Sequence, residues 1–152
     1  MVQVSRRLRM IFSLSLLGLL LGCPRQVELT LVGQAEPGRP IFGLTPVRRG
    51  EPNYLGVLIV APCAGFDGTA RSAMWFIVGD APIERVEYGR VPAGYSAQGY
   101  MTGPLSDQGE LAPLSAGCYI ARTDGTGSVT FEVRPDGTVL ATPEGQDSRG
   151  AT

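Results

Sequence analysis

Glycine and proline place the first limit on the fold of this chain. They supply 21 and 12 of its 152 residues. Glycine weakens helices and proline interrupts them, whereas both residues are common in turns. No helical period of useful length follows residue 22. The sequence therefore predicts an all-β protein of short strands and many turns.

Short apolar or alternating segments supply the expected strands. They lie at 27–32, 54–60, 74–78, 83–88, 118–123, 128–134 and 138–141, with at most one more near 96–102. The continuous apolar runs 54–60 and 74–78 predict strands that are buried on both faces. In 128–134, Val129, Phe131 and Val133 should share one face of a sheet. Together these segments predict a single small antiparallel β-sandwich of seven or eight strands over residues 27–142.

The connections between these strands have their own signals. Residues 33–52 contain several prolines, so we expect a loop there with at most one edge strand. Asp136-Gly137 is typical of a two-residue hairpin turn. Residues 143–152 are polar and are expected to form a disordered tail.

The first 22 residues have the parts of an export signal. Arg6, Arg7 and Arg9 precede an apolar stretch at 10–21, and the small residue Gly22 follows it. The stretch has 12 residues, whereas a helix needs about 20 residues to cross a bilayer. The segment therefore predicts a cleaved signal peptide.

The residues at the end of this segment, Leu20-Leu21-Gly22-Cys23, resemble the lipobox of bacterial lipoproteins. The resemblance implies cleavage after Gly22, a diacylglycerol on the Cys23 sulfur and, often, an acylated amino terminus. Residues 23–26 would then be a short tether to the lipid bilayer. Pro24, in place of an aspartate, implies the outer membrane facing the periplasm if the cell is Gram-negative. An ordinary secretory signal or an uncleaved anchor, with Cys23 incidental, is the alternative.

With Cys23 assigned to lipid, two cysteines remain. Cys63 and Cys118 would meet an oxidising compartment after export, so a disulfide between them is the simplest interpretation. Two buried thiols or a two-thiolate metal site are the alternatives. We predict no metal and no cofactor. Three Asp-Gly-Thr sequences, at 67–69, 124–126 and 136–138, lack the spaced acids of a calcium loop and favour turns. A zinc site at the two cysteines would need two further ligands from carboxylates alone.

The order Cys63, Trp75, Cys118 also resembles that of immunoglobulin-like sandwiches, in which a tryptophan packs on a disulfide between the two sheets. The resemblance implies an immunoglobulin-like topology with Trp75 in the core. Ala116 is a departure from it, because it stands where a tyrosine corner would place its tyrosine.

Composition excludes most catalytic chemistry. All 13 cationic residues are arginine, and histidine is absent. There is therefore no Ser-His, Cys-His or Ser-Lys pair and no Schiff-base lysine. From residue 23 onward the chain holds 10 arginines and 14 acidic residues, a formal charge of −4 without a basic stripe, which argues against nucleic-acid binding.

These observations predict a non-enzymatic lipoprotein of the cell envelope, a binding or structural module whose partner is an envelope protein or a polysaccharide. Its expected contact surface is the irregular segment 88–113, through Tyr88, Tyr95 and Tyr100. An accessory subunit of an envelope transport or secretion complex would share every one of these features. The other alternative is a hydrolase that uses two carboxylates, such as a glycosidase, with candidates Asp67, Asp80, Glu84, Glu87 and Asp107.

Overall fold

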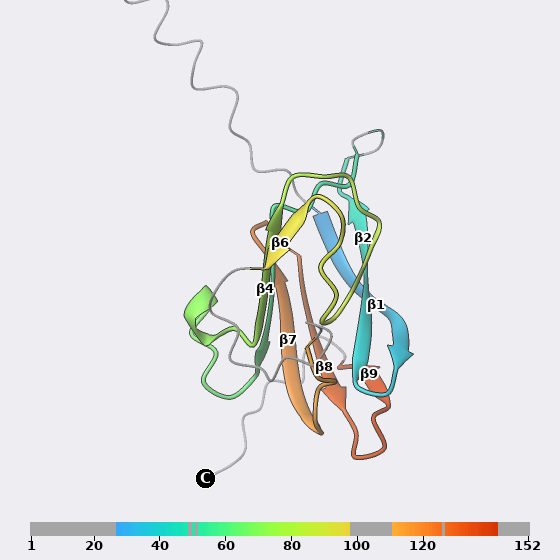
Figure 1. The fold of residues 1–152 in the computed structure, drawn as a ribbon, viewed down its shortest axis with the longest axis vertical. Helices are drawn as coiled ribbons and strands as arrows, with labels where there is room; N and C mark the ends of the chain where they lie inside the picture. Colours follow the sequence, from blue (N-terminus) through green and yellow to red (C-terminus); the bar gives the residue numbers. More distant parts are fainter. Residues whose placement is uncertain (1–26, 49, 51, 98–110, 126, 143–152) are drawn as a thin grey trace, which may run out of the picture.

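A computed structural model of the protein describes residues 27–48, 50, 52–97, 111–125 and 127–142. Within these residues two antiparallel sheets pack as a small sandwich (Figure 1). The strands are β1 (Val27–Glu36), β2 (Arg39–Pro46), β3 (Val57–Pro62), β4 (Trp75–Gly79), β5 (Arg85–Glu87), β6 (Tyr95–Ala97), β7 (Gly117–Thr123), β8 (Ser128–Val133) and β9 (Val139–Ala141). A 3₁₀ turn, η2 (Ala70–Ser72), lies between β3 and β4. The predicted all-β sandwich is confirmed, with more strands than expected. The segments predicted to be the signal peptide (1–22), the tether (23–26) and the tail (143–152) lie outside the described residues.

The smaller sheet has the order β1-β2-β5 and contains a central strand where a loop with at most one edge strand was expected. The prediction for 33–52 was wrong, because β2 is the central strand of this sheet. Pro40 and Pro46 do not prevent the pairing, since β2 pairs with β5 only over Ile41–Gly43, between the two prolines. The Pro40 carbonyl, which proline retains, accepts a hydrogen bond from the Tyr88 N–H at 3.0 Å.

The larger sheet has the order β6-β4-β3-β7-β8-β9. In β8, Phe131 and Val133 are buried and Val129 is half-buried, so the predicted shared face is confirmed. The runs around β3 and β4 do form strands, but only one face of each is fully buried. Leu58, Val60, Trp75 and Ile77 point into the core, whereas their neighbours on the outer face, such as Ile59 and Phe76, are half-buried.

The β8–β9 connection is a hairpin, as predicted, but its turn has three residues. The Arg134 N–H donates to the Thr138 carbonyl at 2.9 Å, and the Gly137 N–H donates to the Arg134 carbonyl at 2.8 Å. A two-residue turn on Asp136-Gly137 would pair Pro135 with Thr138 and would require an N–H that proline lacks. Gly137, at φ 82°, instead closes a three-residue turn.

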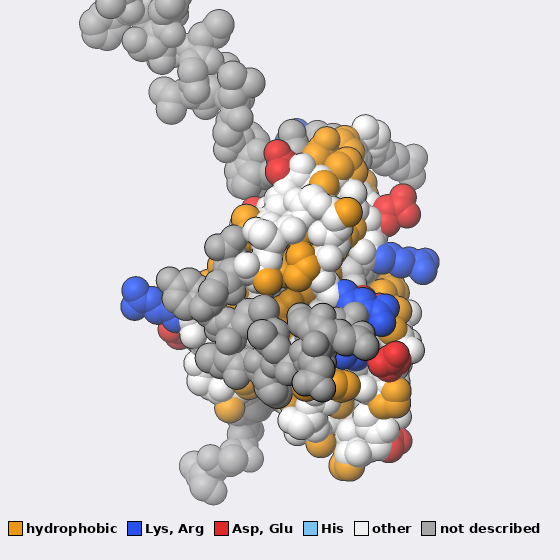
Figure 2. All heavy atoms as spheres, viewed as in Figure 1, with side chains coloured by type: hydrophobic (Ala, Val, Ile, Leu, Met, Phe, Trp, Pro, Cys, Tyr) orange, Lys and Arg blue, Asp and Glu red, His pale blue; other side chains and the backbone are white. Residues whose placement is uncertain are grey.

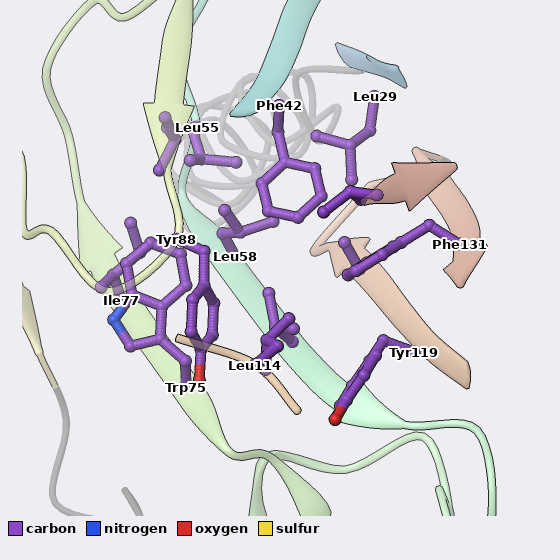
Figure 3. Packing of buried hydrophobic residues seen from close by; sticks show 14 of the residues in the cluster. Leu29, Phe42, Leu55, Leu58, Trp75, Ile77, Tyr88, Leu114, Tyr119 and Phe131 are labelled. Carbon is purple, nitrogen blue, oxygen red and sulfur yellow. The ribbon is translucent and has the colours of Figure 1, made fainter. Parts of the chain in front are cut away.

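Aromatic side chains join the two layers in the core (Figure 3). Phe42 of β2 meets Phe131 of β8 edge to face, with ring centroids 5.7 Å apart. Trp75 of β4 meets Tyr88, which follows β5, in the same geometry at 5.4 Å. Each pair takes one ring from each sheet, so the aromatic contacts hold the sheets against each other. Trp75 is 1% exposed and is a core residue, as expected.

Candidate functional site

The predicted disulfide between Cys63 and Cys118 is confirmed. The two Cα atoms are 5.4 Å apart, and the Cys63 N–H donates to the Cys118 carbonyl at 2.9 Å. Cys118 lies in β7, and Cys63 directly follows β3, the strand beside it. The bond therefore joins neighbouring strands of one sheet, and Cys118 is exposed.

This position contradicts what the immunoglobulin resemblance implies. In that fold the bridge crosses between the sheets and the tryptophan packs on it. Here the bridge stays within the larger sheet, and the contact between sheets at Trp75 is made with Tyr88. The sequence spacing could not reveal this difference, because the same spacing fits partners on adjacent strands and partners on facing strands.

A tyrosine nevertheless anchors the start of β7. The Tyr119 hydroxyl donates to the Ser115 carbonyl at 2.9 Å, four residues upstream. Its ring stacks on Phe131 with centroids 5.7 Å apart. This contact ties the chain that enters β7 to the core in the manner of a tyrosine corner. The immunoglobulin resemblance did not predict this contact, because Tyr119 directly follows the second cysteine, whereas a tyrosine corner places its tyrosine two residues before that cysteine.

The tyrosines proposed as a contact surface do not act together. Tyr88 is 1% exposed, so its assignment to a surface was wrong. Burial, with a smaller contribution from Tyr119, raises the pKa of Tyr88 to about 12. Tyr95 is half-buried and its hydroxyl donates to the Ala81 carbonyl at 2.7 Å, while partial burial raises its pKa. Tyr100 lies outside the described residues.

Two of the Asp-Gly-Thr sequences use their carboxylates to close turns. The Asp67 carboxylate accepts hydrogen bonds from Thr69 N–H, Thr69 hydroxyl and Ser72 hydroxyl at 2.7–2.8 Å. These bonds, that of the Thr69 hydroxyl first, lower the pKa of Asp67 to about 2. The Asp136 carboxylate likewise accepts from the Thr138 N–H at 2.9 Å, which lowers the pKa of Asp136. Turn formation accounts for both carboxylates.

Among the hydrolase candidates, Asp67 closes the turn described above and Asp80 is exposed. Glu87 pairs with Arg90 at 2.9 Å, and Glu84, three residues before Glu87, is exposed. Asp107 lies outside the described residues. Within the part of the chain that is described, no three cysteine or acidic side chains gather as a metal site.

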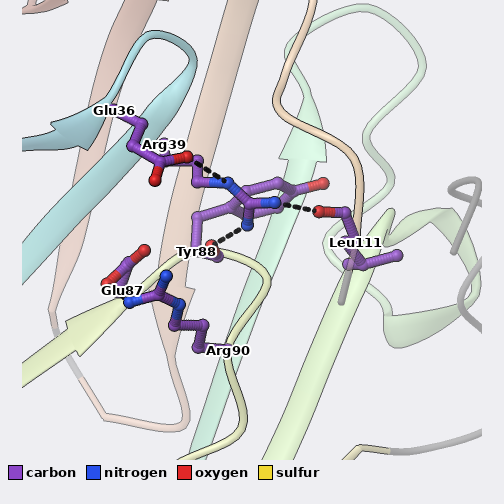
Figure 4. A network of polar contacts seen from close by, with 6 residues as sticks. All are labelled: Glu36, Arg39, Glu87, Tyr88, Arg90 and Leu111. Carbon is purple, nitrogen blue, oxygen red and sulfur yellow. Dashed lines mark hydrogen bonds and ion pairs between the residues drawn. The ribbon is translucent and has the colours of Figure 1, made fainter. Parts of the chain in front are cut away.

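A buried arginine is the polar group that the sequence analysis missed (Figure 4). Arg39, at the start of β2, is 5% exposed. Its Nη2 donates to the Leu111 carbonyl at 2.8 Å and its Nη1 to the Tyr88 carbonyl at 3.4 Å, while Nε lies 3.4 Å from the Glu36 carboxylate. The guanidinium therefore joins three segments that are distant in sequence, and its partners give it a structural role. No local signal marks Arg39, because backbone carbonyls of remote segments leave no trace in a sequence.

Comparison with known proteins gives no relative from which a function could be transferred. No protein-family model, no curated protein and no solved structure matches the chain. In the described residues, no helix is long and apolar enough to span a membrane.

Proposed function

We propose that this protein is an exported lipoprotein, anchored to a membrane of the bacterial cell envelope through acylated Cys23, whose β-sandwich is a non-enzymatic binding or structural module. The observation that carries the proposal is the Cys63–Cys118 disulfide. Structural disulfides form and persist in oxidising compartments outside the cytoplasm. The third cysteine then stands at the lipobox position, directly after the apolar export segment.

The contacts of the domain support the non-enzymatic part of the proposal. Asp67 and Asp136 close turns, Glu87 forms an ion pair, and Arg39 is bound to backbone carbonyls. The chain contains no histidine or lysine that could act with a remaining carboxylate. A sandwich that carries its partner contacts at its surface is the arrangement that these features favour.

Replacement of the lipobox cysteine tests the anchor. In cells that express the full chain, we expect Cys23→Ala to move the protein out of the membrane fraction and to abolish incorporation of a palmitate analogue. Arg25→Ala, two residues further on, is the matched control and should leave both readouts unchanged. Membrane fractionation of Cys23→Ala at the size of the processed protein would refute lipid attachment at this residue.

Amine labelling gives an independent readout of the same modification. Because the chain contains no lysine, its amino terminus is its only primary amine. If Cys23 is N-acylated, the mature protein should not react with amine-directed dyes, whereas arginine-directed reagents should modify it. Labelling of the mature protein would show a free terminus.

The envelope partner, a protein or a polysaccharide, is proposed to contact the β6 region through Tyr95. The ring of Tyr95 is half-buried, and its hydroxyl is bound to Ala81. We expect Tyr95→Ala to reduce capture of the partner from solubilised envelopes, whereas Tyr95→Phe, which keeps the ring, should retain it. Equal capture by both variants would remove this surface from the proposal.

A further inference from the structure

The end of the sandwich at which β1 begins carries a group of exposed apolar residues. We define this apolar end by Val47, Pro52, Pro82 and Ala93, all of which are exposed. Val47 is 55% exposed, the largest value among the exposed large hydrophobic residues of the described chain. Figure 2 shows hydrophobic side chains gathered at the same end of the visible face.

Three connections converge at this end. Val27, the first residue of β1, pairs with Pro46, so Val47 lies beside the point where the chain enters the domain. Tyr54 forms an isolated bridge with Pro82, which brings the segment after β2 next to the segment after β4 (Figure 1).

The turn before β6 reaches the same place. Its Gly94 lies so close to Ala81 that a Cβ built on the glycine would be 2.6 Å from the Ala81 Cβ. Tyr95, which follows, donates its hydroxyl to the Ala81 carbonyl. Ala93 therefore lies at the same end as Pro82.

We propose that this apolar end rests on the lipid bilayer and orients the domain, an inference that depends on the proposed acylation of Cys23. Only Pro24, Arg25 and Gln26 lie between the lipidated Cys23 and the start of β1 at Val27, which is four residue steps along the chain. Four residues span at most about 14 Å even when fully extended. The headgroup layer on each side of a bilayer takes up about 5–8 Å of that length. The tether therefore holds the β1 end of the sandwich at the membrane surface.

The chemistry of this end favours contact with apolar lipid over attraction to anionic headgroups. Arg48 is exposed there, but so are Glu28, Asp80 and Asp124 on the neighbouring segments. With Arg25, Arg49 and Glu51 of the same segments included, the sequence places three arginines and four acidic residues here, so no net positive charge draws this end to anionic headgroups. We therefore expect the orientation to form on zwitterionic lipid and to change little with salt.

A label at the apolar end tests the orientation. Val47→Cys is compared with Leu140→Cys, which replaces another exposed apolar residue, in β9, near the opposite end of the sandwich. With Cys23 acylated and Cys63 bonded to Cys118, the introduced thiol is the only free one. Each full-length variant is produced in cells, labelled with a polarity-sensitive fluorophore and reconstituted into phosphatidylcholine vesicles that contain nitroxide-bearing lipid.

Quenching should distinguish the two positions. The label at position 47 should lose roughly half of its emission, because apolar groups on a bilayer enter about 5–10 Å into the headgroup and acyl boundary. The label at position 140 should keep its emission. Equal quenching of the two labels in protein that floats with the vesicles would overturn the orientation while leaving the anchor intact. Failure of both variants to float with the vesicles would instead refute the anchor.

A third arm separates lipid from a protein partner. If the label at position 47 were blue-shifted in native membranes but neither blue-shifted nor quenched in the vesicles, the apolar end would be covered by a protein, and the proposal would be wrong. Val47→Asp, at the same exposed position, should weaken the quenching of a label placed at Pro52→Cys, because a charged group replaces an apolar contact. Unchanged quenching in Val47→Asp would also count against the lipid contact.

Discussion

Replacement of Arg39 by methionine removes the buried guanidinium while keeping much of its volume. In the native structure its Nη2 donates to the Leu111 carbonyl at 2.8 Å and its Nη1 to the Tyr88 carbonyl at 3.4 Å. Methionine has no donor, so both carbonyls lose this partner. The ion pair with Glu36 is lost as well, but the Glu36 side chain is 60% exposed.

These contacts set the expected magnitude. A hydrogen bond to a charged group contributes about 1.5–3 kcal/mol, and a buried acceptor left without its partner costs about 1–3 kcal/mol. The exposed ion pair adds about 0–1 kcal/mol. Because the bond to Tyr88 is long, we expect Arg39→Met to lower the free energy of unfolding by about 3 kcal/mol. Glu36→Gln should lower it by less than about 1 kcal/mol.

Urea unfolding followed by fluorescence measures these changes directly. Trp75 is the only tryptophan in the chain and is 1% exposed, so its emission reports on opening of the core. Arg85→Met is the matched control, since Arg85 is exposed on β5 and its loss should change stability by less than about 0.5 kcal/mol. If Arg39→Met were no more destabilising than Arg85→Met, the guanidinium would not stabilise the fold. If it matched Glu36→Gln, the ion pair and not the carbonyl contacts would account for its role.

Three further predictions concern the disulfide and two ionisable groups. Replacing Cys63 and Cys118 together by serine should lower the free energy of unfolding by about 4 kcal/mol in the chain-entropy model for a separation of 55 residues, as urea unfolding would measure. Burial raises the pKa of Tyr88 to about 12, whereas a tyrosine in the unfolded chain ionises at about pH 10. The free energy of unfolding should therefore fall as the pH rises from about 10 toward 12. Ultraviolet titration of the protein, compared with Tyr88→Phe, locates the ionisation of Tyr88. Hydrogen bonds from Thr69 and Ser72 lower the pKa of Asp67 from 3.8 to about 2. The stabilisation that these bonds give should therefore be complete above pH 3.8 and lost as the pH falls through 2. An NMR titration of the Asp67 carboxyl carbon, with unfolding compared in Asp67→Asn, checks this.

Each of these predictions has a distinct contrary result. Equal stability of the oxidised protein and the double serine variant would show that the bridge does not constrain the unfolded chain. A tyrosine titration that is complete near pH 10 would show that the Tyr88 hydroxyl reaches water. An Asp67 midpoint near 3.8 would mean that the turn around Thr69 does not form in solution.

The strands that could be predicted from the sequence are those with a clear apolar pattern. The segments around β3, β4, β7 and β8 form near their expected places. Alternation marked β8, and continuous apolar runs marked β3 and β4, because strands that face a core need apolar side chains at regular positions. The central strand β2 could not be predicted, since its prolines argue against a strand unless the position of its partner is known. The three-residue turn at Gly137 was missed for a related reason, because Pro135 excludes the two-residue alternative only once the pairing of β8 with β9 is considered.

Of the residues considered for a functional site, only the two disulfide cysteines were paired correctly from the sequence. The pairing of Cys63 with Cys118 followed from counting cysteines, although whether it crosses between sheets did not. The surface assigned to Tyr88 failed because an aromatic residue beside glycine-rich sequence can belong to either a loop or the core. Arg39 gave no signal, since its partners Tyr88 and Leu111 are 49 and 72 residues away.

The sequence by itself determined the all-β class, because its glycines and prolines leave little room for helices, and it made a Cys63–Cys118 disulfide the simplest interpretation. The resemblance of residues 20–23 to a lipobox and the lack of histidine and lysine also support the proposal of an anchored, non-enzymatic module. Only the tertiary structure decided which strands are neighbours, since register and sheet order depend on contacts between distant residues. It placed the disulfide within one sheet, the aromatic pairs between the sheets, and Val47 at the end where the chain enters the domain. These arrangements depend on packing in three dimensions, which local sequence patterns do not encode.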